Sequence, residues 1–267
     1  MSATPNGPDR DTATVGMTGE RPDGRDRVSA GPARAGRSAK GETERLELTR
    51  VEQTLARRSA ESKATVPHLY LRADIDMSEA VEIRAALKEA AEDEAAPSVN
   101  DMVVKAVALA LRRHPRANAA YKDGGLELYS KINVGIAVAT EGTFLTPTIV
   151  DADRLGLDEI AAESRRLAES VREGRITPPE LAGGTFTVSN LGMFGVRSFD
   201  AVINGGQAGI LAVGEVSERS VVRDGKSGSA HMMEVSLACD HRILYGSRAA
   251  AFLSEIRRNL EEPEFPG

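Results

Sequence analysis

The chain of 267 residues is poor in the residues that build disulfide frameworks and membrane spans. It contains one cysteine, Cys239, no tryptophan and only 4% aromatic residues. A lone cysteine excludes an internal disulfide framework and fits a reducing compartment. No apolar run approaches the roughly 18 residues that a membrane-spanning helix needs, and the N-terminus lacks the charged-then-apolar pattern of a secretory signal. We therefore expect a cytoplasmic protein that has no membrane partner.

An excess of positive charge is also missing from the sequence. The formal net charge is −6, which leaves no basic face for nucleic acid. The hydrophobic share of 41% and the charged share of 28% are those of an ordinary globular protein. We therefore expect a folded protein without a nucleic-acid partner.

The first 43 residues contain almost no large apolar side chain and are rich in Gly, Pro, Ser and Ala. Burial of apolar surface would not offset the entropy of ordering such a segment. We interpret residues 1–43 as a disordered tail or the remnant of a linker, with an artificial extension as the alternative. The folded domain is expected to comprise residues 44–267.

Helical and strand patterns alternate along the rest of the chain, which predicts an α/β fold with one sizeable mixed sheet. The helical patterns cover 46–62, 77–93, 98–115, 158–174 and 247–262, and the strand patterns cover 68–76, 131–140, 184–190, 208–216 and 231–239.

The strand expected at 131–140 has two unlike faces. One face is apolar and the other is small, which suits close packing or the lining of a channel. The apolar face carries Ile132, Val134, Ile136 and Val138, and the small face carries Asn133, Gly135, Ala137 and Ala139.

Four histidines, His68, His114, His231 and His241, are available for acid–base chemistry. An imidazole is the side chain whose unperturbed pKa suits proton transfer near neutral pH. The first three stand at a strand start, a helix end and after a polar loop, where structural or solvated roles suffice. His241, in the run ACDHRILYG (238–246), follows a strand end. Its surroundings leave two roles open: a structural turn histidine, or a ring nitrogen presented to a channel.

Two further side chains have chemical potential. Ser189 ends a β-branched strand, where it forms either a Ser-Asn turn or a hydroxyl group that projects from a rigid support. Cys239 precedes His241 by two positions, so a Cys–His nucleophile pair is conceivable. A small buried cysteine at the end of a core strand is far commoner, and we expect Cys239 to be structural.

Three stretches resemble one family: GGTFTVSNLGMFGV (183–196), INGGQAGILAVG (203–214) and DHRILYG (240–246). They are similar to the catalytic domain of the dihydrolipoamide acyltransferases of 2-oxo acid dehydrogenase complexes, which shares its fold with chloramphenicol acetyltransferase. The likeness runs in order over about residues 46–262. It implies a two-layer sandwich in which helices flank a mixed β-sheet, assembled as a homotrimer with sites at the subunit interfaces.

The resemblance also implies a mechanism. In this family a histidine takes the proton from an attacking thiol or hydroxyl group, and a serine hydroxyl group stabilises the oxyanion. These roles fall on His241, which matches the histidine of an H-R-x-x-D-G pattern, and on Ser189 in the T-[IV]-S-N run. Their neighbours Asn190, Asp240 and Arg242 are expected to support them. Acetyl-CoA is the expected co-substrate, and no metal is expected.

The sequence departs from the family pattern at two positions. Tyr245 stands where the family has the aspartate of H-R-x-x-D-G. In the family this aspartate pairs with an arginine, and the matching run LTRVEQTLARR (48–58) has Glu52 in its place. Because both members of the pair are replaced, we expect Tyr245 to donate a hydrogen bond to Glu52. The alternative is that Tyr245 faces the acceptor pocket and binds substrate.

A third departure concerns the N-terminal segment. Only 43 residues precede the expected domain, too few for a lipoyl domain, and we expect no lipoyl attachment site in this chain. We therefore expect an enzyme that acetylates a small-molecule hydroxyl group, similar to the tetronate O-acetyltransferases of natural-product pathways. One alternative is a dihydrolipoamide acyltransferase core served by a separate lipoyl protein. Another is an inactive trimeric scaffold.

Overall fold

A mixed β-sheet of six strands organises the residues that the structure describes. The structure is a computed structural model, and it describes residues 39, 41, 43–90, 96–140, 142–223 and 225–265. The described residues from Leu48 onward form one compact unit. The expected disordered tail, 1–43, lies outside the described residues except for three positions, so that interpretation stays a prediction.

The strands of the main sheet are mostly antiparallel. β8 lies parallel to both of its neighbours, β4 and β9, which makes the sheet mixed, as expected. Across the sheet the order is β1 (His68–Asp76), β10 (Lys226–Asp240), β9 (Gly209–Arg223), β8 (Phe186–Asn190), β4 (Val134–Ile136) and β7 (Thr148–Ile149). Two small antiparallel sheets pair β2 (Ala119–Lys122) with β3 (Gly125–Leu128), and β5 (Val138–Thr140) with β6 (Thr143–Leu145).

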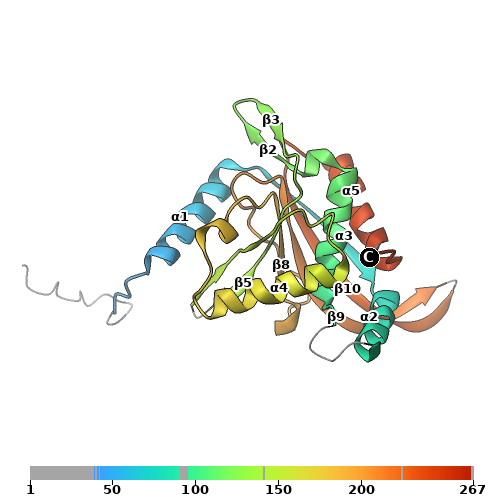
Figure 1. Cartoon of the computed structure of the whole chain (residues 1–267). Coiled ribbons are helices and arrows are strands. Elements are labelled where there is room, and N and C mark those ends of the chain that lie inside the picture. Colours follow the sequence, from blue (N-terminus) through green and yellow to red (C-terminus); the bar gives the residue numbers. More distant parts are fainter. Residues whose placement is uncertain are drawn as a thin grey trace, which may run out of the picture. The chain divides into compact units, whose positions relative to one another are not determined.

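Four helices cover one face of the sheet, and a fifth lies apart from them (Figure 1). The covering helices are α2 (Ser78–Ala90), α3 (Val99–Arg113), α4 (Leu157–Arg172) and α5 (Gly246–Glu261), and the separate helix is α1 (Arg50–Thr65). Short 3₁₀ helices span Pro115–Ala117, Pro178–Leu181 and Gly192–Phe194. None of the helices in the described part of the chain is long and apolar enough to cross a membrane.

Local sequence signals explain where α1 and α3 begin and where α3 ends. Thr49 and Glu52 form a capping box that starts α1, and Ser98 and Asp101 form another that starts α3. α3 ends before Pro115, which cannot continue a helix. Ten of its 15 residues are buried, and its bounds agree with the helical pattern predicted at 98–115.

The two faces of the main sheet carry different side chains. The face toward α3 and α5 is large and apolar, and its side chains are at most 1% exposed: Phe186, Val188, Leu211, Val213, Val235 and Leu237. The opposite face is small or polar and carries Thr187, Ser189, Ala212, Ser236 and Ala238. We call the first the helical face and the second the groove face. A loop at 199–207 crosses the groove face and packs Ala201 and Ile203 onto it.

The strand expected at 131–140 is divided in the structure. The N–H group of Ala137 still donates to the carbonyl oxygen of Val188, and the chain then leaves the main sheet to form β5. The predicted difference between its faces is confirmed, since Val134 and Ile136 are buried in the core while Gly135 and Ala137 line the groove described below.

Candidate active site

A groove of about 970 Å³ runs over the groove face of the sheet. Its floor is formed by β8 and β4, and its walls are α1, the β5–β6 hairpin and the loop at 199–207. Two of the predicted site residues line it: Ser189 at the end of β8, and Arg242 in the turn that follows β10.

Ser189 lies on the floor of this groove. Its side chain is half-buried, and its hydroxyl group has no hydrogen-bond partner within the described residues. The neighbouring hydroxyl group on the same face, that of Thr187, is fully committed: it donates to Gln207 Oε1 at 2.7 Å and accepts from Asn204 Nδ2 at 2.9 Å. Ser189 therefore supplies the hydroxyl group of β8 that is free to donate to a ligand in the groove.

Asn190 fixes the chain just after this serine. Its Oδ1 accepts a hydrogen bond from the N–H group of Gly192 at 2.8 Å, and its Nδ2 donates to Asn100 Oδ1 at 3.2 Å. A Cβ atom on Gly192 would lie 2.6 Å from the carbonyl oxygen of Gly214, so the turn needs glycine there. The expected supporting role of Asn190 therefore has a geometric basis in the turn that ends β8.

A tight turn after β10 presents His241. Asp240 is buried and accepts from both the backbone N–H and the guanidinium group of Arg242. The Arg242 guanidinium carbon lies 4.3 Å from the centre of the Tyr121 ring, so the arginine is held between a carboxylate and an aromatic face. The hydrogen bonds that Arg242 donates to Asp240 raise the pKa of Arg242. Asp240 and Arg242 therefore make the turn rigid.

His241 itself is exposed on this rigid turn. Its N–H group donates to the carbonyl oxygen of Pro67 at 3.0 Å, while its imidazole makes no hydrogen bond within the described residues. The ring lies against that of Tyr245, with centroids 5.7 Å apart and planes at 88°. Since Tyr245 is also 50% exposed, the two rings stand together at the surface.

Ser189 and His241 do not meet within one chain. Ser189 pairs with Ala212, which pairs with Ser236 on β10; His241 follows five residues later, in the turn just after the end of that strand. The two residues are therefore separated by roughly 16 Å along the sheet and about 10 Å across it, or ~19 Å in all. An imidazole and a hydroxyl group at that separation cannot act on one bond.

The expected pairing of Tyr245 with Glu52 is wrong within one chain. The carboxylate of Glu52 accepts from the backbone N–H of Thr49 at 2.7 Å, and this capping box lowers the pKa of Glu52. Helix α1 then spans roughly 20 Å from Glu52 to Thr65, which lies near the His241 turn. Glu52 instead lies near Gly142 of the β5–β6 hairpin.

The loop at 199–207 is tied to its surroundings by residues that the sequence did not single out. Asp200 accepts from Arg72 on β1 and from Ser236 on β10, both at 2.6 Å. Ser62 of α1 donates to the carbonyl oxygen of Ile203 at 2.6 Å. These partners lie far apart in the chain, so no local sequence pattern predicts their contacts.

His68 ties the same loop to the end of α1. Its Nδ1 lies 2.8 Å from the carbonyl oxygen of Val66, and its Nε2 accepts from the N–H group of Ile203 at 3.2 Å. These partners assign the proton to Nδ1. The structural role expected for His68 therefore agrees with the geometry.

The remaining candidates fit structural roles. His114 ends α3 and contacts the ring of Phe252 edge to face. Cys239 is fully buried on the helical side, and burial raises its pKa to about 12, so the thiol stays protonated and is no nucleophile at neutral pH. Among the described residues, no group of three or more His, Cys, Asp or Glu side chains is placed to hold a metal ion.

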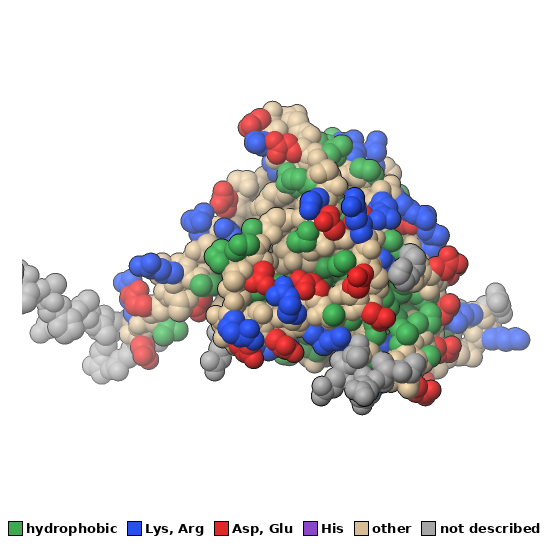
Figure 2. Space-filling view, in the orientation of Figure 1, with side chains coloured by type: hydrophobic (Ala, Val, Ile, Leu, Met, Phe, Trp, Pro, Cys, Tyr) green, Lys and Arg blue, Asp and Glu red, His purple; other side chains and the backbone are tan. Residues whose placement is uncertain are grey.

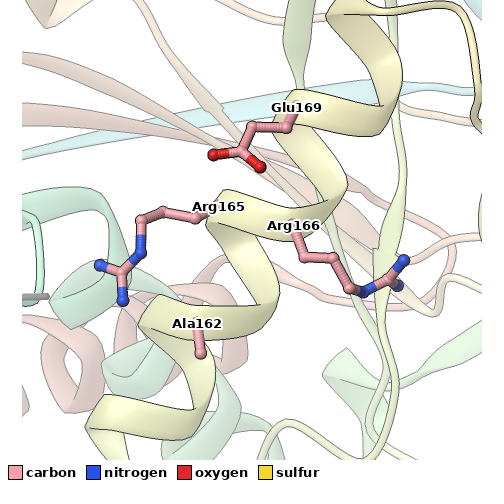
Figure 3. Close-up of a pocket in the computed structure, with 4 residues that line it drawn as sticks. All are labelled: Ala162, Arg165, Arg166 and Glu169. Atoms are coloured by element: carbon pink, nitrogen blue, oxygen red, sulfur yellow. The ribbon is translucent and has the colours of Figure 1, made fainter. Parts of the chain in front are cut away.

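A second hollow lies on the surface of α4 and offers no site. Arg165 and Arg166 point away from one another (Figure 3). Arg166 is bound by Glu163 and Glu180, which raise its pKa, and Arg165 reaches the carbonyl oxygen of Ala96. Acidic and basic side chains are mixed over the surface around α4 (Figure 2). The charge of Arg166 is therefore already neutralised by two carboxylates, and Arg165 is held by a backbone oxygen.

The comparison with family models matches residues 40–266 to "2-oxoacid dehydrogenases acyltransferase (catalytic domain)". The dihydrolipoyllysine-residue acetyltransferase component of the pyruvate dehydrogenase complex of Rickettsia bellii is 38% identical over 215 residues, which are 80% of this chain and 51% of that protein. The chain thus spans about half the length of the curated relatives it matches.

Two solved structures share the fold over nearly their whole length. A probable dihydrolipoamide acetyltransferase from Listeria monocytogenes has a TM-score of 0.80 at 31% identity, with 85% of this chain and 99% of that chain covered. The dihydrolipoamide acetyltransferase of Azotobacter vinelandii also has a TM-score of 0.80 at 31% identity, with 84% and 94% covered. Its structure accompanied enzymatic work on a serine, a histidine and an asparagine in its catalytic mechanism. The expected α/β fold is confirmed.

Proposed function

The chain belongs to the family of 2-oxoacid dehydrogenase acyltransferase catalytic domains, and on this basis we propose that it transfers an acetyl group between coenzyme A and a dihydrolipoamide thiol. The relatives are acetyltransferases of dihydrolipoyl groups, so they favour a thiol acceptor over the natural-product hydroxyl group that the sequence first suggested. The resemblance to tetronate O-acetyltransferases has no support among these relatives. A cytoplasmic location remains part of the proposal.

One observation carries the assignment of the site. Ser189 and His241 lie 52 positions apart, and the serine and the histidine studied in the Azotobacter vinelandii enzyme have the same separation. Ser189 also offers the free hydroxyl group of β8 on the groove floor, and His241 offers an imidazole at the surface. The third residue of that study, an asparagine, follows its histidine by four positions, where this chain has Tyr245.

The proposed mechanism follows from these two side chains. The imidazole of His241 takes the proton from the attacking thiol, whose sulfur adds to the carbonyl carbon of the acetyl thioester. The Ser189 hydroxyl group donates a hydrogen bond to the oxyanion that forms. The intermediate then collapses, the carbon–sulfur bond of the leaving thiol breaks, and His241 returns its proton to that sulfur.

The distance between the two residues requires a second copy of the chain. Since Ser189 and His241 lie ~19 Å apart in one chain, each active site would combine the serine of one subunit with the histidine of another. We therefore propose a homotrimer with sites at the subunit interfaces, in which cyclic symmetry repeats the same pairing three times. The groove, which has Ser189 on its floor, is the surface that would receive the neighbouring His241 turn.

The wall of the groove also suits acetyl-CoA, the proposed donor of the acetyl group. Helix α1 contributes Arg57 and Arg58. Arg57 lies 3.6 Å from Glu61, while Arg58 has no ion-pair partner within the described residues. An unpaired guanidinium group beside the groove would attract the phosphate groups of coenzyme A.

Two single variants and their mixture test this function. With acetyl-CoA and free dihydrolipoamide, His241→Ala should lose at least ~10²-fold in turnover, and Ser189→Ala ~10²–10³-fold. Mixing the two inactive variants under subunit exchange should restore roughly a quarter of the sites, since a site is intact only when each copy supplies its unaltered residue. A small-molecule hydroxyl acceptor run in parallel tests the other acceptor class.

Several results would contradict the proposal. Full thiol-transfer activity in His241→Ala would exclude the proposed base. A monomer by light scattering, or no recovery despite demonstrated exchange, would exclude shared sites. Acetylation of hydroxyl acceptors with no turnover of dihydrolipoamide would move the function to the other acceptor class. No acetyl transfer to either acceptor would favour the scaffold.

A further inference from the structure

We propose that Tyr245 is a positioning residue that holds the imidazole of His241 through ring contact instead of a hydrogen bond. The inference rests on the proposed role of His241 in acetyl transfer. It concerns the position at which this chain differs from the Azotobacter vinelandii enzyme, whose asparagine stands four residues after its histidine.

The geometry of the two rings is that of an attractive aromatic pair. Their centroids are 5.7 Å apart and their planes meet at 88°. Edge-to-face pairs are favoured at separations of about 4.5–7 Å. The imidazole makes no hydrogen bond within the described residues, so its contact with Tyr245 is the interaction there that restricts its rotation.

The backbone of His241 is held independently of Tyr245. Its N–H group bonds to Pro67, and the turn is fixed by the contact of Asp240 with Arg242. Arg242 is held in turn by the ring of Tyr121. Loss of the Tyr245 ring would therefore leave the turn in place and release the imidazole.

Helix stability does not explain a tyrosine at this position. Tyr245 is the N-cap residue of α5, with φ −73° and ψ 159°, and its side chain makes no capping hydrogen bond. Asn, Asp, Ser and Thr are favoured at N-caps because their side chains accept from the first free N–H groups of the helix. An aromatic ring occupies a position where a short polar side chain would stabilise the helix more, which points to a role for the ring.

The test compares two variants that both lack the ring but differ as helix caps. Tyr245→Ala and Tyr245→Asn should each lower kcat by about 3- to 10-fold, the value of one aromatic pair, with KM for both substrates unchanged. Tyr245→Asn should nevertheless melt about 2–4 °C above Tyr245→Ala, since it restores a cap. Tyr245→Phe keeps the ring and should restore kcat. Ser247→Ala, exposed in the same turn, is the control for changes that do not touch the pair.

A spectroscopic readout separates this inference from the proposed function. The ring-proton signals of His241, assigned by their loss in His241→Ala, should shift in Tyr245→Ala and Tyr245→Asn and stay in place in Tyr245→Phe. This holds even if the wild-type protein transfers no acetyl group, a result that would defeat the function and leave the ring contact testable.

Three outcomes would overturn the inference. One is wild-type kcat in both Tyr245→Ala and Tyr245→Asn, which would mean that the ring is not needed to position His241. Another is a raised KM for the acceptor at constant kcat, which would assign Tyr245 to substrate binding. The last is a set of His241 signals that are the same with and without the ring.

Discussion

The helical face and the groove face of one sheet are built from alternate residues of the same strands, yet they differ in kind. On β8, Phe186 and Val188 are buried against helices, while Thr187 and Ser189 face the groove. On β9, Leu211 faces the helices and its neighbour Ala212 the groove. One-residue steps along a strand therefore separate side chains that hold the fold from side chains available to a ligand.

The difference teaches how a rigid support and an open site coexist. The helical face gains its stability from apolar burial, which is large and without direction. The groove face is small and is held by directed hydrogen bonds such as those of Thr187 and Asp200. We expect changes on the first face to alter stability alone, and changes on the second to alter activity at modest cost in stability.

The largest effect is expected on the helical face. Leu211 is fully buried in the core cluster, and Leu211→Ala removes its contacts and leaves a cavity. We expect a loss of about 3–5 kcal/mol in the free energy of unfolding. Denaturant titration measures this loss, and kcat per folded molecule should stay at the wild-type value. A large drop in kcat of the folded fraction would contradict the assignment of stability to the helical face and of activity to the groove face.

A smaller effect is expected one strand away on the groove face. Thr187→Val keeps the shape of the side chain but removes the hydroxyl group that joins Gln207 and Asn204. Leaving these partners unsatisfied should cost about 1–2 kcal/mol. Because both partners belong to the loop at 199–207, KM should rise as well. Thr187→Ser is the matched control, since it keeps the hydroxyl group, and equal behaviour of the two variants would contradict the role of the bond.

The same contrast explains how much the sequence could predict. β1 was predicted with its observed bounds, His68–Asp76, because Pro67 precedes a run of strand-forming residues. β9 and β10 extend far beyond the predicted runs, 208–216 and 231–239. The extension is a polar hairpin whose two strands pair through their backbones, so no hydrophobic pattern predicts it. The β2–β3 hairpin was missed as well, although its Asp-Gly turn, with φ 49° at Asp123, is a recognised hairpin signal.

The site was predictable only in part, for a related reason. Ser189 and His241 came from family motifs, and Asn190, Asp240 and Arg242 are fixed by bonds to near neighbours in the chain. The contact of Arg242 with Tyr121, and the bonds of Asp200 to Arg72 and Ser236, join residues far apart in sequence. The Tyr245–Glu52 pair is not formed within one chain for the same reason, because matching two motifs by position does not give the path of α1 between them.

The stability that the helical face provides should depend on pH through Cys239. Burial raises the pKa of Cys239 to about 12 in the folded protein, above the ordinary thiol value of 9.0. The unfolded chain therefore loses this proton first, and the contribution to stability is complete below pH 9 and declines as the pH rises toward 12. The loss should be on the order of 1 kcal/mol at pH 10. It should be absent in Cys239→Ala, and an equal alkaline loss in that variant would assign it to other groups.

The smallest expected effect is the energetic coupling between Glu52, at the start of α1, and Tyr245, beside His241. We expect this coupling to be zero within one subunit. Glu52 caps α1 through Thr49, so Glu52→Ala should lower the melting temperature slightly by weakening the capping box. Tyr245 contacts His241, and the length of α1 lies between the two sites. Residues so far apart, with no shared partner, should give additive effects. We therefore expect the shifts in melting temperature of Glu52→Ala and Tyr245→Ala to add in the double variant, measured on the dissociated subunit and on the assembled protein. Additivity in both would place Glu52 in helix capping alone, whereas coupling confined to the assembly would mean that the tyrosine of one subunit reaches the Glu52 of another.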